Sequence, residues 1–314
     1  MTAEVLVLDL HADIYAEHLR REFPALRVHT ARDRSELPGD LASIGVLIAF
    51  GIAIDDALMT RLTGLKWVQS LATGVDHFLR CPTFKPGALL TSGRGIHGPS
   101  MRESTAYLML SLAQNARQRH KDQNEHHWQR RLWSLLCDKT AVVVGIGVVG
   151  EAVGALLKAF GMRVIGVSRT PRTIAGFDEI VPRERLHDAA READYLIAIL
   201  PGSAENRAAF DAGVFAAMKP SACFINVGRG ETVDQDALID ALRTKRIAGA
   251  GLDVFAATPL PKDNPLWDMP NVVITPHVAG FFVEYEDTIM PLIVENMRLF
   301  LEGKGSEMRN LVAR

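Results

Sequence analysis

The sequence predicts an α/β protein with two parallel-sheet domains, and three observations support this expectation. The chain has 314 residues, which is enough for two domains that each bury their own core. Apolar runs of strand length alternate with helical patterns, as in repeated β-α-β units. The alternation comes in two series, one before residue 100 and one from residue 140 onward.

The elements follow in order from this alternation. In the first series, strands are expected at 5–10, 46–50, 66–70 and 88–92, and helices near 12–23 and 54–63. A long helical pattern then follows Ser100, and its polar continuation over 121–131 is predicted to be a surface passage between domains. In the second series, strands are expected at 140–145, 162–167, 194–200, 222–227, 249–254 and 271–276, before a last helix at about 282–302.

The two series predict a nested domain arrangement. Residues 1–100 plus 287–314 are expected to form a substrate (catalytic) domain. Residues 101–286 are expected to form a dinucleotide-binding domain inserted into it, and both domains are predicted to be Rossmann-like or flavodoxin-like.

Composition excludes several classes of protein. The formal net charge of −2 gives no electrostatic footprint for nucleic acid or an anionic membrane. The N-terminal segment lacks the residue order of a signal peptide, and no apolar run reaches spanning length. Cys81, Cys137 and Cys223 form neither a disulfide framework nor a metal spacing. We therefore expect a cytoplasmic protein with no metal.

The segment TAVVVGIGVVGEAVG, residues 140–154, carries the strongest motif. A predicted strand delivers Gly145, Gly147 and Gly150 in G-x-G-x-x-G spacing, and a helical pattern follows. These glycines permit a tight turn, close approach of a pyrophosphate and close packing of helix on strand. A glycine-rich turn in another α/β protein is the alternative, but the strand before the motif and the strand after it favour a dinucleotide site.

The end of the next strand predicts which dinucleotide binds. Recognition of a free ribose 2′-hydroxyl needs an acid about 20 residues past the glycines. This chain instead has Ser168, Arg169 and Thr170, followed by Arg172. Two guanidinium groups and two hydroxyls can bind a 2′-phosphate, so NADP(H) is favoured over NAD(H). The alternative is a solvated basic loop.

Later strand ends carry residues suited to catalysis. Arg229, the 253–258 strand end and His277 each follow an apolar strand, so they are expected at the carboxyl edge of one sheet. An arginine can clamp a carboxylate and polarise a carbonyl, and a histidine can transfer the proton that accompanies a hydride. A solvated Arg and a structural His are the alternatives. Their joint occurrence behind a dinucleotide motif favours catalysis.

Taken together, these segments resemble the D-isomer-specific 2-hydroxyacid dehydrogenases over nearly the whole chain. The segments that carry the resemblance are LATGVDHF (71–78), RESTAYLMLSL (102–112), KTAVVVGIGVVG (139–150), LPGSAENR (200–207), MKPSACFINVGRG (218–230), GLDVF (251–255) and TPHVAG (275–280).

The resemblance implies specific roles. A substrate-carboxylate loop is implied at Ala72, Thr73, Gly74 and Val75, which bind through backbone N–H groups. Arg229 is implied to bind carboxylate and carbonyl, and His277 to be the general acid–base. Asp253 is implied to contact the nicotinamide end of the cofactor. Further cofactor-binding positions are Val148, Val149, Leu200, Pro201, Val227, Gly228, His277 and Gly280.

Thr258 is a departure from the pattern, because the family usually has a Glu here that hydrogen-bonds the catalytic His. A hydroxyl can hold the imidazole ring but brings no charge, so the His lacks the upward push on its pKa that a carboxylate gives. Thr258 is therefore a catalytic candidate with altered tuning. Glu284 and Asp287, from the following helix, are the candidates to replace the missing acid.

The function expected from the sequence is NADPH-dependent interconversion of a small 2-oxo acid and its D-2-hydroxy acid. Glyoxylate, hydroxypyruvate or an aryl-pyruvate fit the class, but the sequence does not name the substrate. A non-catalytic dinucleotide sensor of the same fold is the alternative. The resemblance also implies a homodimer.

Overall fold

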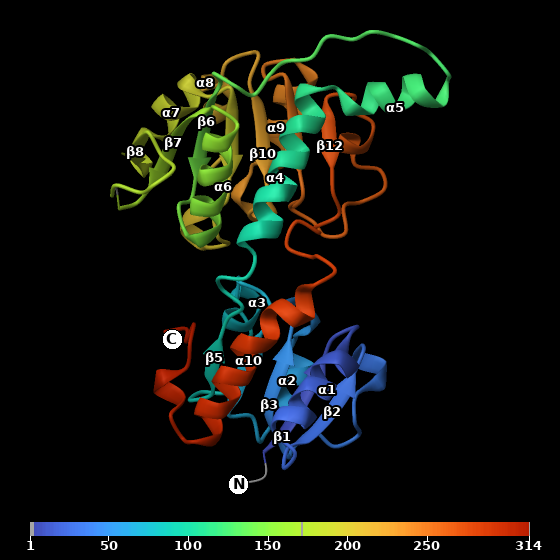
Figure 1. The fold of residues 1–314 in the computed structure, drawn as a ribbon, viewed down its shortest axis with the longest axis vertical. Helices are drawn as coiled ribbons and strands as arrows, with labels where there is room; N and C mark the ends of the chain where they lie inside the picture. Colours follow the sequence, from blue (N-terminus) through green and yellow to red (C-terminus); the bar gives the residue numbers. More distant parts are fainter. Residues whose placement is uncertain (1–2, 171, 314) are drawn as a thin grey trace. The chain divides into compact units, whose positions relative to one another are not determined.

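The computed structural model describes residues 3–170 and 172–313, and the chain divides into two compact units. Unit 1 comprises Met1–Ile96 and Phe282–Arg314, and unit 2 comprises His97–Phe281. The sequence placed its domain boundaries a few residues further along the chain, at 100 and 287. Each unit contains its own parallel sheet with helices on both faces (Figure 1).

Unit 1 is built on a five-stranded parallel sheet of order β2-β1-β3-β4-β5, the flavodoxin-like arrangement. Its strands are β1 (Glu4–Leu8), β2 (Arg27–Ala31), β3 (Ile44–Ala49), β4 (Trp67–Ser70) and β5 (Leu89–Thr91). Its helices are α1 (Ala12–Glu22), α2 (Asp56–Arg61), α3 (Asp76–Leu79) and α10 (Tyr285–Leu301), with 3₁₀ turns η1 (Arg34–Glu36), η2 (Gly51–Ala53) and η7 (Gly305–Glu307).

The period-2 pattern of β1 divides the core of unit 1 into two layers. Val5 and Val7 face one side, where they join side chains of α1 and α10 such as Tyr15 and Ile289. Leu6 and Leu8 face the other side and join residues of α2 and α3. Because successive strand residues point to opposite faces, a continuous apolar run fills both layers.

Unit 2 is built on a seven-stranded parallel sheet of order β12-β11-β10-β9-β6-β7-β8. Its strands are β6 (Thr140–Val144), β7 (Arg163–Ser168), β8 (Glu179–Pro182), β9 (Tyr195–Ala198), β10 (Cys223–Asn226), β11 (Gly249–Leu252) and β12 (Val272–Ile274). Its helices are α4 (Gly98–Ala113), α5 (Ala116–Asn124), α6 (Val148–Ala159), α7 (Leu186–Glu192), α8 (Ala212–Ala217) and α9 (Gln235–Arg243), with 3₁₀ turns η3 (Arg183–Arg185), η4 (Ala204–Asn206), η5 (Gly230–Thr232) and η6 (Pro265–Trp267).

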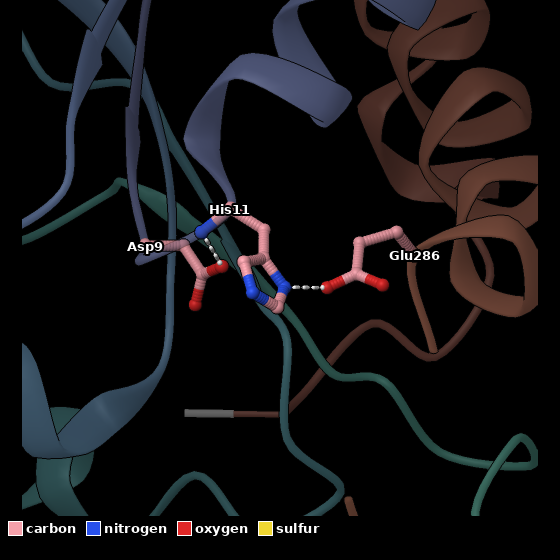
Figure 2. A group of neighbouring side chains, drawn as sticks. All are labelled: Asp9, His11 and Glu286. Atoms are coloured by element: carbon pink, nitrogen blue, oxygen red, sulfur yellow. Dashed lines mark hydrogen bonds and ion pairs between the residues drawn. The ribbon is translucent and has the colours of Figure 1, made fainter. Parts of the chain in front are cut away.

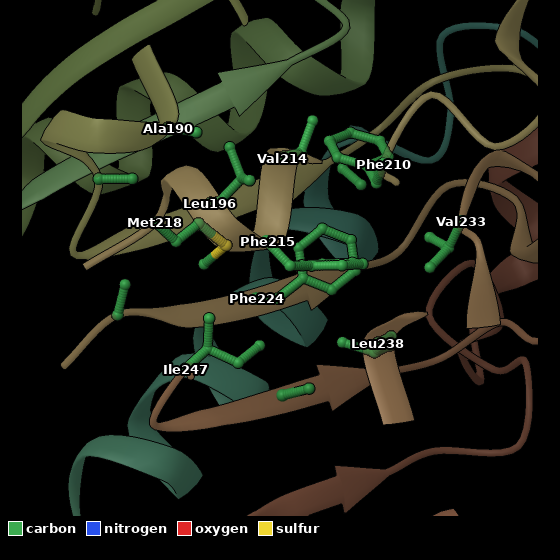
Figure 3. Close-up of a cluster of buried hydrophobic side chains, with 14 of the residues drawn as sticks. Ala190, Leu196, Phe210, Val214, Phe215, Met218, Phe224, Val233, Leu238 and Ile247 are labelled. Atoms are coloured by element: carbon green, nitrogen blue, oxygen red, sulfur yellow. The ribbon is translucent and has the colours of Figure 1, made fainter. Parts of the chain in front are cut away.

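The sheet of unit 2 is also covered on both faces. On one face, α7, α8 and α9 pack over a cluster that includes Phe210, Phe215 and Phe224 (Figure 3). The Phe215 and Phe224 rings meet edge to face with centroids 5.3 Å apart. On the other face, α4 and α6 pack over Val143 and Ile197. The order of strands reverses between β6 and β9, which makes this the topological switch point.

The structure adds elements that the sequence pattern did not predict. Both β2 and β8 are edge strands, and most of their residues are only partly buried. The predicted surface passage over 121–131 begins as the last turns of α5 and continues without regular structure. Asp122 binds Arg131 there through two hydrogen bonds of 2.5 and 3.0 Å.

Among the described residues, no helix combines the length and apolar character needed to cross a bilayer.

Candidate active site

The register of unit 2 aligns the predicted site residues along the carboxyl edge of its sheet. Adjacent strands pair Ile274, Leu252, Asn226, Ala198, Val144 and Val167 in one row across the sheet. The residues that follow this row begin the loops that carry His277, Asp253, Arg229, Leu200, Gly145 and Ser168. Ligands of open α/β sheets bind at this edge, and here the row spans the switch point.

The glycine motif has the geometry that its spacing predicts. Gly145 has φ +102°, and a Cβ there would lie 2.7 Å from the Ile199 carbonyl oxygen. A Cβ on Gly150 would lie 2.3 Å from the Gly145 carbonyl oxygen. A Cβ on Gly147 meets nothing within 4 Å. Gly147 therefore borders open space, and α6 begins directly after it, at Val148 and Val149.

The loop after β7 holds its cations in exposed ion pairs. Arg169 Nη1 lies 2.9 Å from Glu205 Oε2, and Arg172 Nη2 lies 2.8 Å from Glu151 Oε1. The Thr170 N–H donates to Ser168 Oγ at 3.3 Å. Exposed pairs of this kind contribute only about 0–1 kcal/mol, so an incoming anion can replace either carboxylate at little cost.

Two buried polar side chains shape the turn that carries Arg229. Asn226 Oδ1 accepts from the Gly228 N–H at 3.0 Å, and Asn226 Nδ2 donates to the Arg229 carbonyl at 3.2 Å. The Thr232 hydroxyl donates to the same carbonyl at 2.7 Å. Both side chains are buried, so the backbone of this turn is fixed by bonds that water does not weaken.

Asp253 organises the loop that carries His277. Its carboxylate, 1% exposed, accepts from the Thr275 hydroxyl at 2.6 Å and from the N–H groups of Val278 and Ala279 at 2.9 and 3.1 Å. The His277 N–H donates to the Asp253 carbonyl at 2.9 Å, and His277 has φ +58°. A histidine in this left-handed region is strained, and the surrounding bonds maintain it. The cofactor contact implied for Asp253 remains a prediction.

The Thr258 turn also lies after β11, and its side chain is exposed. The Thr258–Pro259 peptide is cis. Within residues 3–170 and 172–313, the Thr258 hydroxyl makes no hydrogen bond to His277. The part of Thr258 in catalysis therefore remains a prediction.

The remaining predicted cofactor residues lie in neighbouring loops of the same edge. A Cβ on Gly228 would lie 2.9 Å from the Leu200 carbonyl oxygen, so the turn with Val227 and Gly228 approaches the Leu200–Pro201 turn closely. Asn206 Nδ2 donates to the Pro201 carbonyl at 2.9 Å and fixes that second turn. Gly280 follows the His277 loop, and a Cβ there would lie 3.1 Å from His97 Cδ2.

In unit 1, the predicted carboxylate loop follows β4 at the carboxyl edge of its own sheet. Ser70 Oγ accepts from the Ala72 N–H at 3.2 Å, and the Gly93 N–H donates to the Ala72 carbonyl at 2.8 Å. Thr73 and Gly74 lead into Val75, the residue before α3. The loop thus begins from a fixed point on the sheet.

Known proteins are similar to this chain in both sequence and fold. A family model described as D-isomer specific 2-hydroxyacid dehydrogenase, NAD binding domain, matches residues 106–279. This chain belongs to the D-isomer-specific 2-hydroxyacid dehydrogenase family. A glyoxylate reductase of Aeropyrum pernix is 32% identical over 261 residues, covering 80% of this chain and 78% of the relative.

Two solved structures extend the likeness over the whole chain. A D-isomer specific 2-hydroxyacid dehydrogenase family protein from Aeromonas salmonicida superposes with a TM-score of 0.91 at 32% identity, covering 100% of this chain and 99% of the other. An NADPH-dependent glyoxylate/hydroxypyruvate reductase from Sinorhizobium meliloti, solved with NADP and sulfate, has a TM-score of 0.86 at 28% identity, covering 99% and 98%.

The protein is therefore a 2-hydroxyacid dehydrogenase, an NAD(P)-dependent oxidoreductase. The family and the fold class predicted from its sequence are both confirmed by these comparisons. The residues that support its site were not predicted, namely Asn206, Asn226, Thr232 and Thr275. Their side chains bond to the backbone of turns or to Asp253, and the motifs gave no weight to their positions. A polar residue at the buried end of an apolar strand, such as Asn226, is the one signal that could have indicated such a role.

Proposed function

We propose that this enzyme uses NADPH to reduce a small 2-oxo acid of the glyoxylate, hydroxypyruvate or aryl-pyruvate class to its D-2-hydroxy acid. One observation carries the proposal: Arg229 and His277 stand on loops of one sheet edge, after β10 and β12, and each loop is held by a buried polar residue. Asn226 holds the first loop and Asp253 the second. Rigid support of this kind is what a catalytic pair requires.

The residues present fit a dinucleotide. The open space at Gly147 admits a pyrophosphate, and the N-terminus of α6 offers N–H groups to it. Arg169 and Arg172 are placed after β7 to exchange their carboxylate partners for a 2′-phosphate. The complex of the Sinorhizobium reductase with NADP supports this choice of cofactor.

The chemistry divides between the two loops. A dinucleotide held at the Gly147 turn would supply the hydride for the carbonyl carbon from its nicotinamide. Arg229 binds the carboxylate and stabilises the negative charge that develops on the carbonyl oxygen, and His277 delivers the proton to that oxygen. The loop Ala72–Val75 binds the substrate carboxylate through its N–H groups. Thr258 occupies the place of the usual Glu, and Thr258→Glu is expected to move the alkaline limit of activity to higher pH.

We further propose a homodimer that works in a reducing compartment, the cytoplasm. Between α5 and β6, Trp128, Leu132 and Leu135 are 93%, 101% and 65% exposed, and a second copy of the chain would cover them. Light scattering on the purified protein tests this, since a monomer at micromolar concentration would contradict it. The three cysteines are free, as a reducing compartment favours.

The cofactor claim is tested with Ser168→Asp, which places the missing acid at the end of β7. Losing a charged contact to the phosphate costs about 1.5–3 kcal/mol, or roughly one to two decades in affinity for NADPH. The variant is expected to shift its preference toward NADH. Tighter binding of NADH than of NADPH by the unaltered enzyme would contradict the claim.

A further inference from the structure

A second group of polar side chains lies in unit 1, at the carboxyl end of β1 (Figure 2). Asp9 and His11 come from the β1–α1 connection, and Glu286 from the first turn of α10, 275 positions from His11. His11 Nδ1 hydrogen-bonds Glu286 Oε1 at 2.5 Å, and the His11 N–H donates to Asp9 Oδ1 at 2.9 Å. One nitrogen or oxygen atom from each of the three lies within 4.8 Å of the others.

This group concentrates negative charge in a partly buried place. Glu286 is buried and Asp9 is half-buried. Even with His11 protonated, the two carboxylates leave the group with an excess negative charge that a cation would neutralise.

A buried hydroxyl gives an independent sign of a missing ligand. Tyr15 is fully buried on α1, and its hydroxyl has no hydrogen-bond partner among the described residues. Tyr15 follows His11 by four residues, and its hydroxyl is close enough to Asp9 and Glu286 to interact with their charges. A buried polar atom without a hydrogen-bond partner is destabilising, so a water or ion beside this hydroxyl would remove that cost.

We propose that Asp9, His11 and Glu286 form a binding site for a divalent cation, and that Zn²⁺ suits it best. An imidazole nitrogen and two carboxylate oxygens are typical zinc ligands, whereas Mg²⁺ and Ca²⁺ prefer oxygen alone. Tetrahedral coordination needs ligand atoms roughly 3.3 Å apart. The His11 side chain is 53% exposed, so its rotation, with the hydrogen bond to Glu286 exchanged for the metal, would bring the three groups to this spacing. A water in the fourth position would offer the Tyr15 hydroxyl the hydrogen-bond partner that it lacks.

The site would fasten the β1–α1 connection to α10 within unit 1. It lies at the same edge of the sheet as the Ala72–Val75 loop, but β3 separates β1 from β4. Cation binding at this place requires neither a 2-oxo acid nor NADPH. It is therefore independent of the proposed reductase activity.

Titration calorimetry with ZnCl₂ on the chelator-treated full-length enzyme tests the proposal. We expect one site per chain, and a rise in melting temperature of about 5–10 °C at a hundredfold excess over Kd. His11→Ala and Glu286→Gln are each expected to weaken Zn²⁺ binding at least a hundredfold. Tyr15→Phe, which removes only the hydroxyl, is expected to weaken it about tenfold, as loss of a supporting hydrogen bond does.

His18→Ala is the matched control. His18 also lies on α1 and pairs with an acid of α10, since its Nε2 is 3.7 Å from Asp287 Oδ1, but it lies outside the group of three. This variant is expected to bind Zn²⁺ like the unaltered enzyme. Visible absorption of bound Co²⁺ reports the same site even if a variant changes stability. No stoichiometric Zn²⁺ binding, or equal loss in His18→Ala and His11→Ala, would overturn the proposal.

Discussion

Alanine substitutions at two glycines of the dinucleotide motif should have different effects: Gly150→Ala is expected to lower stability, and Gly147→Ala to weaken cofactor binding. Gly150 lies in α6, and its added Cβ would sit 2.3 Å from the Gly145 carbonyl oxygen, at least 1 Å inside ordinary contact. Overpacking of this kind costs about 1–3 kcal/mol, and the better helix propensity of alanine offsets up to about 1 kcal/mol. We expect a net loss of about 1–2 kcal/mol, or about 2–8 °C in melting temperature.

Gly147→Ala should behave differently. Gly147 has φ −105° and ψ −164°, a conformation open to alanine, and its Cβ would meet nothing within 4 Å. Stability should hold or rise by about 0.4–1 kcal/mol, because alanine has less freedom in the unfolded chain. The methyl group fills the space that we assign to the pyrophosphate. Affinity for NADPH should therefore fall at least tenfold, about 1.4 kcal/mol.

The assay pairs thermal denaturation with a fluorescence titration of NADPH. Gly39→Ala is the control, since its Cβ also meets nothing within 4 Å but Gly39 lies in unit 1. It should change neither quantity by much. If Gly147→Ala bound NADPH as tightly as the Gly39 control, the phosphate would not lie against Gly147, and the reasoning would fail.

Three further variants test other contacts. Arg229→Lys keeps the charge but loses the two-pronged guanidinium, so kcat/KM should fall at least a hundredfold, about 2.7 kcal/mol; a value within threefold of the unaltered enzyme would remove Arg229 from the mechanism. Asp253→Asn replaces one of the two accepting oxygens by an NH₂ group, which then faces one or two of the three donors, so melting temperature and kcat should both fall; unchanged kcat would show that the His277 loop does not need this carboxylate. The Arg131 guanidinium lowers the pKa of Asp122 to about 2, so this carboxylate stabilises the fold above its ordinary pKa of 3.8 and loses that effect as pH falls toward 2. Denaturation experiments should therefore show that Asp122→Asn has a lower free energy of unfolding than the unaltered protein at pH 7, and that this difference shrinks below pH 3.8. A difference in the free energy of unfolding that does not change with pH would contradict the prediction.

The sequence predicted the central strands of both sheets because burial on both faces demands unbroken apolar runs. Strand β6, with Val142 and Val143 on opposite faces, is such a case. The edge strands β2 and β8 escaped prediction because each pairs on one side only and carries exposed polar residues such as Arg27 and Glu179. In these two strands, pairing with the neighbouring strand of the sheet takes the place of an apolar run.

In the candidate active site too, some features were predicted from the sequence and others were not. Arg229 and His277 were placed at strand ends because each follows an apolar run and a turn, and parallel strands bring such ends to one edge. The bonds that hold their loops were beyond prediction, since Asn226 and Asp253 act on backbone atoms whose position only the folded chain defines. The pairing of His11 with Glu286 spans 275 positions and leaves no local pattern at all.

Oxidation of NADPH in the presence of a panel of 2-oxo acids tests the central claim most directly. The panel should include glyoxylate, hydroxypyruvate and phenylpyruvate, with NADH measured in parallel and the products of the last two acids separated on a chiral column, since glycolate has no stereocentre. We expect turnover of at least one of these acids, with the D-2-hydroxy acid as the product wherever the product is chiral, and kcat/KM for NADPH at least tenfold above that for NADH, about 1.4 kcal/mol. Failure to consume NADPH with every acid, formation of the L product, or a preference for NADH would contradict the account.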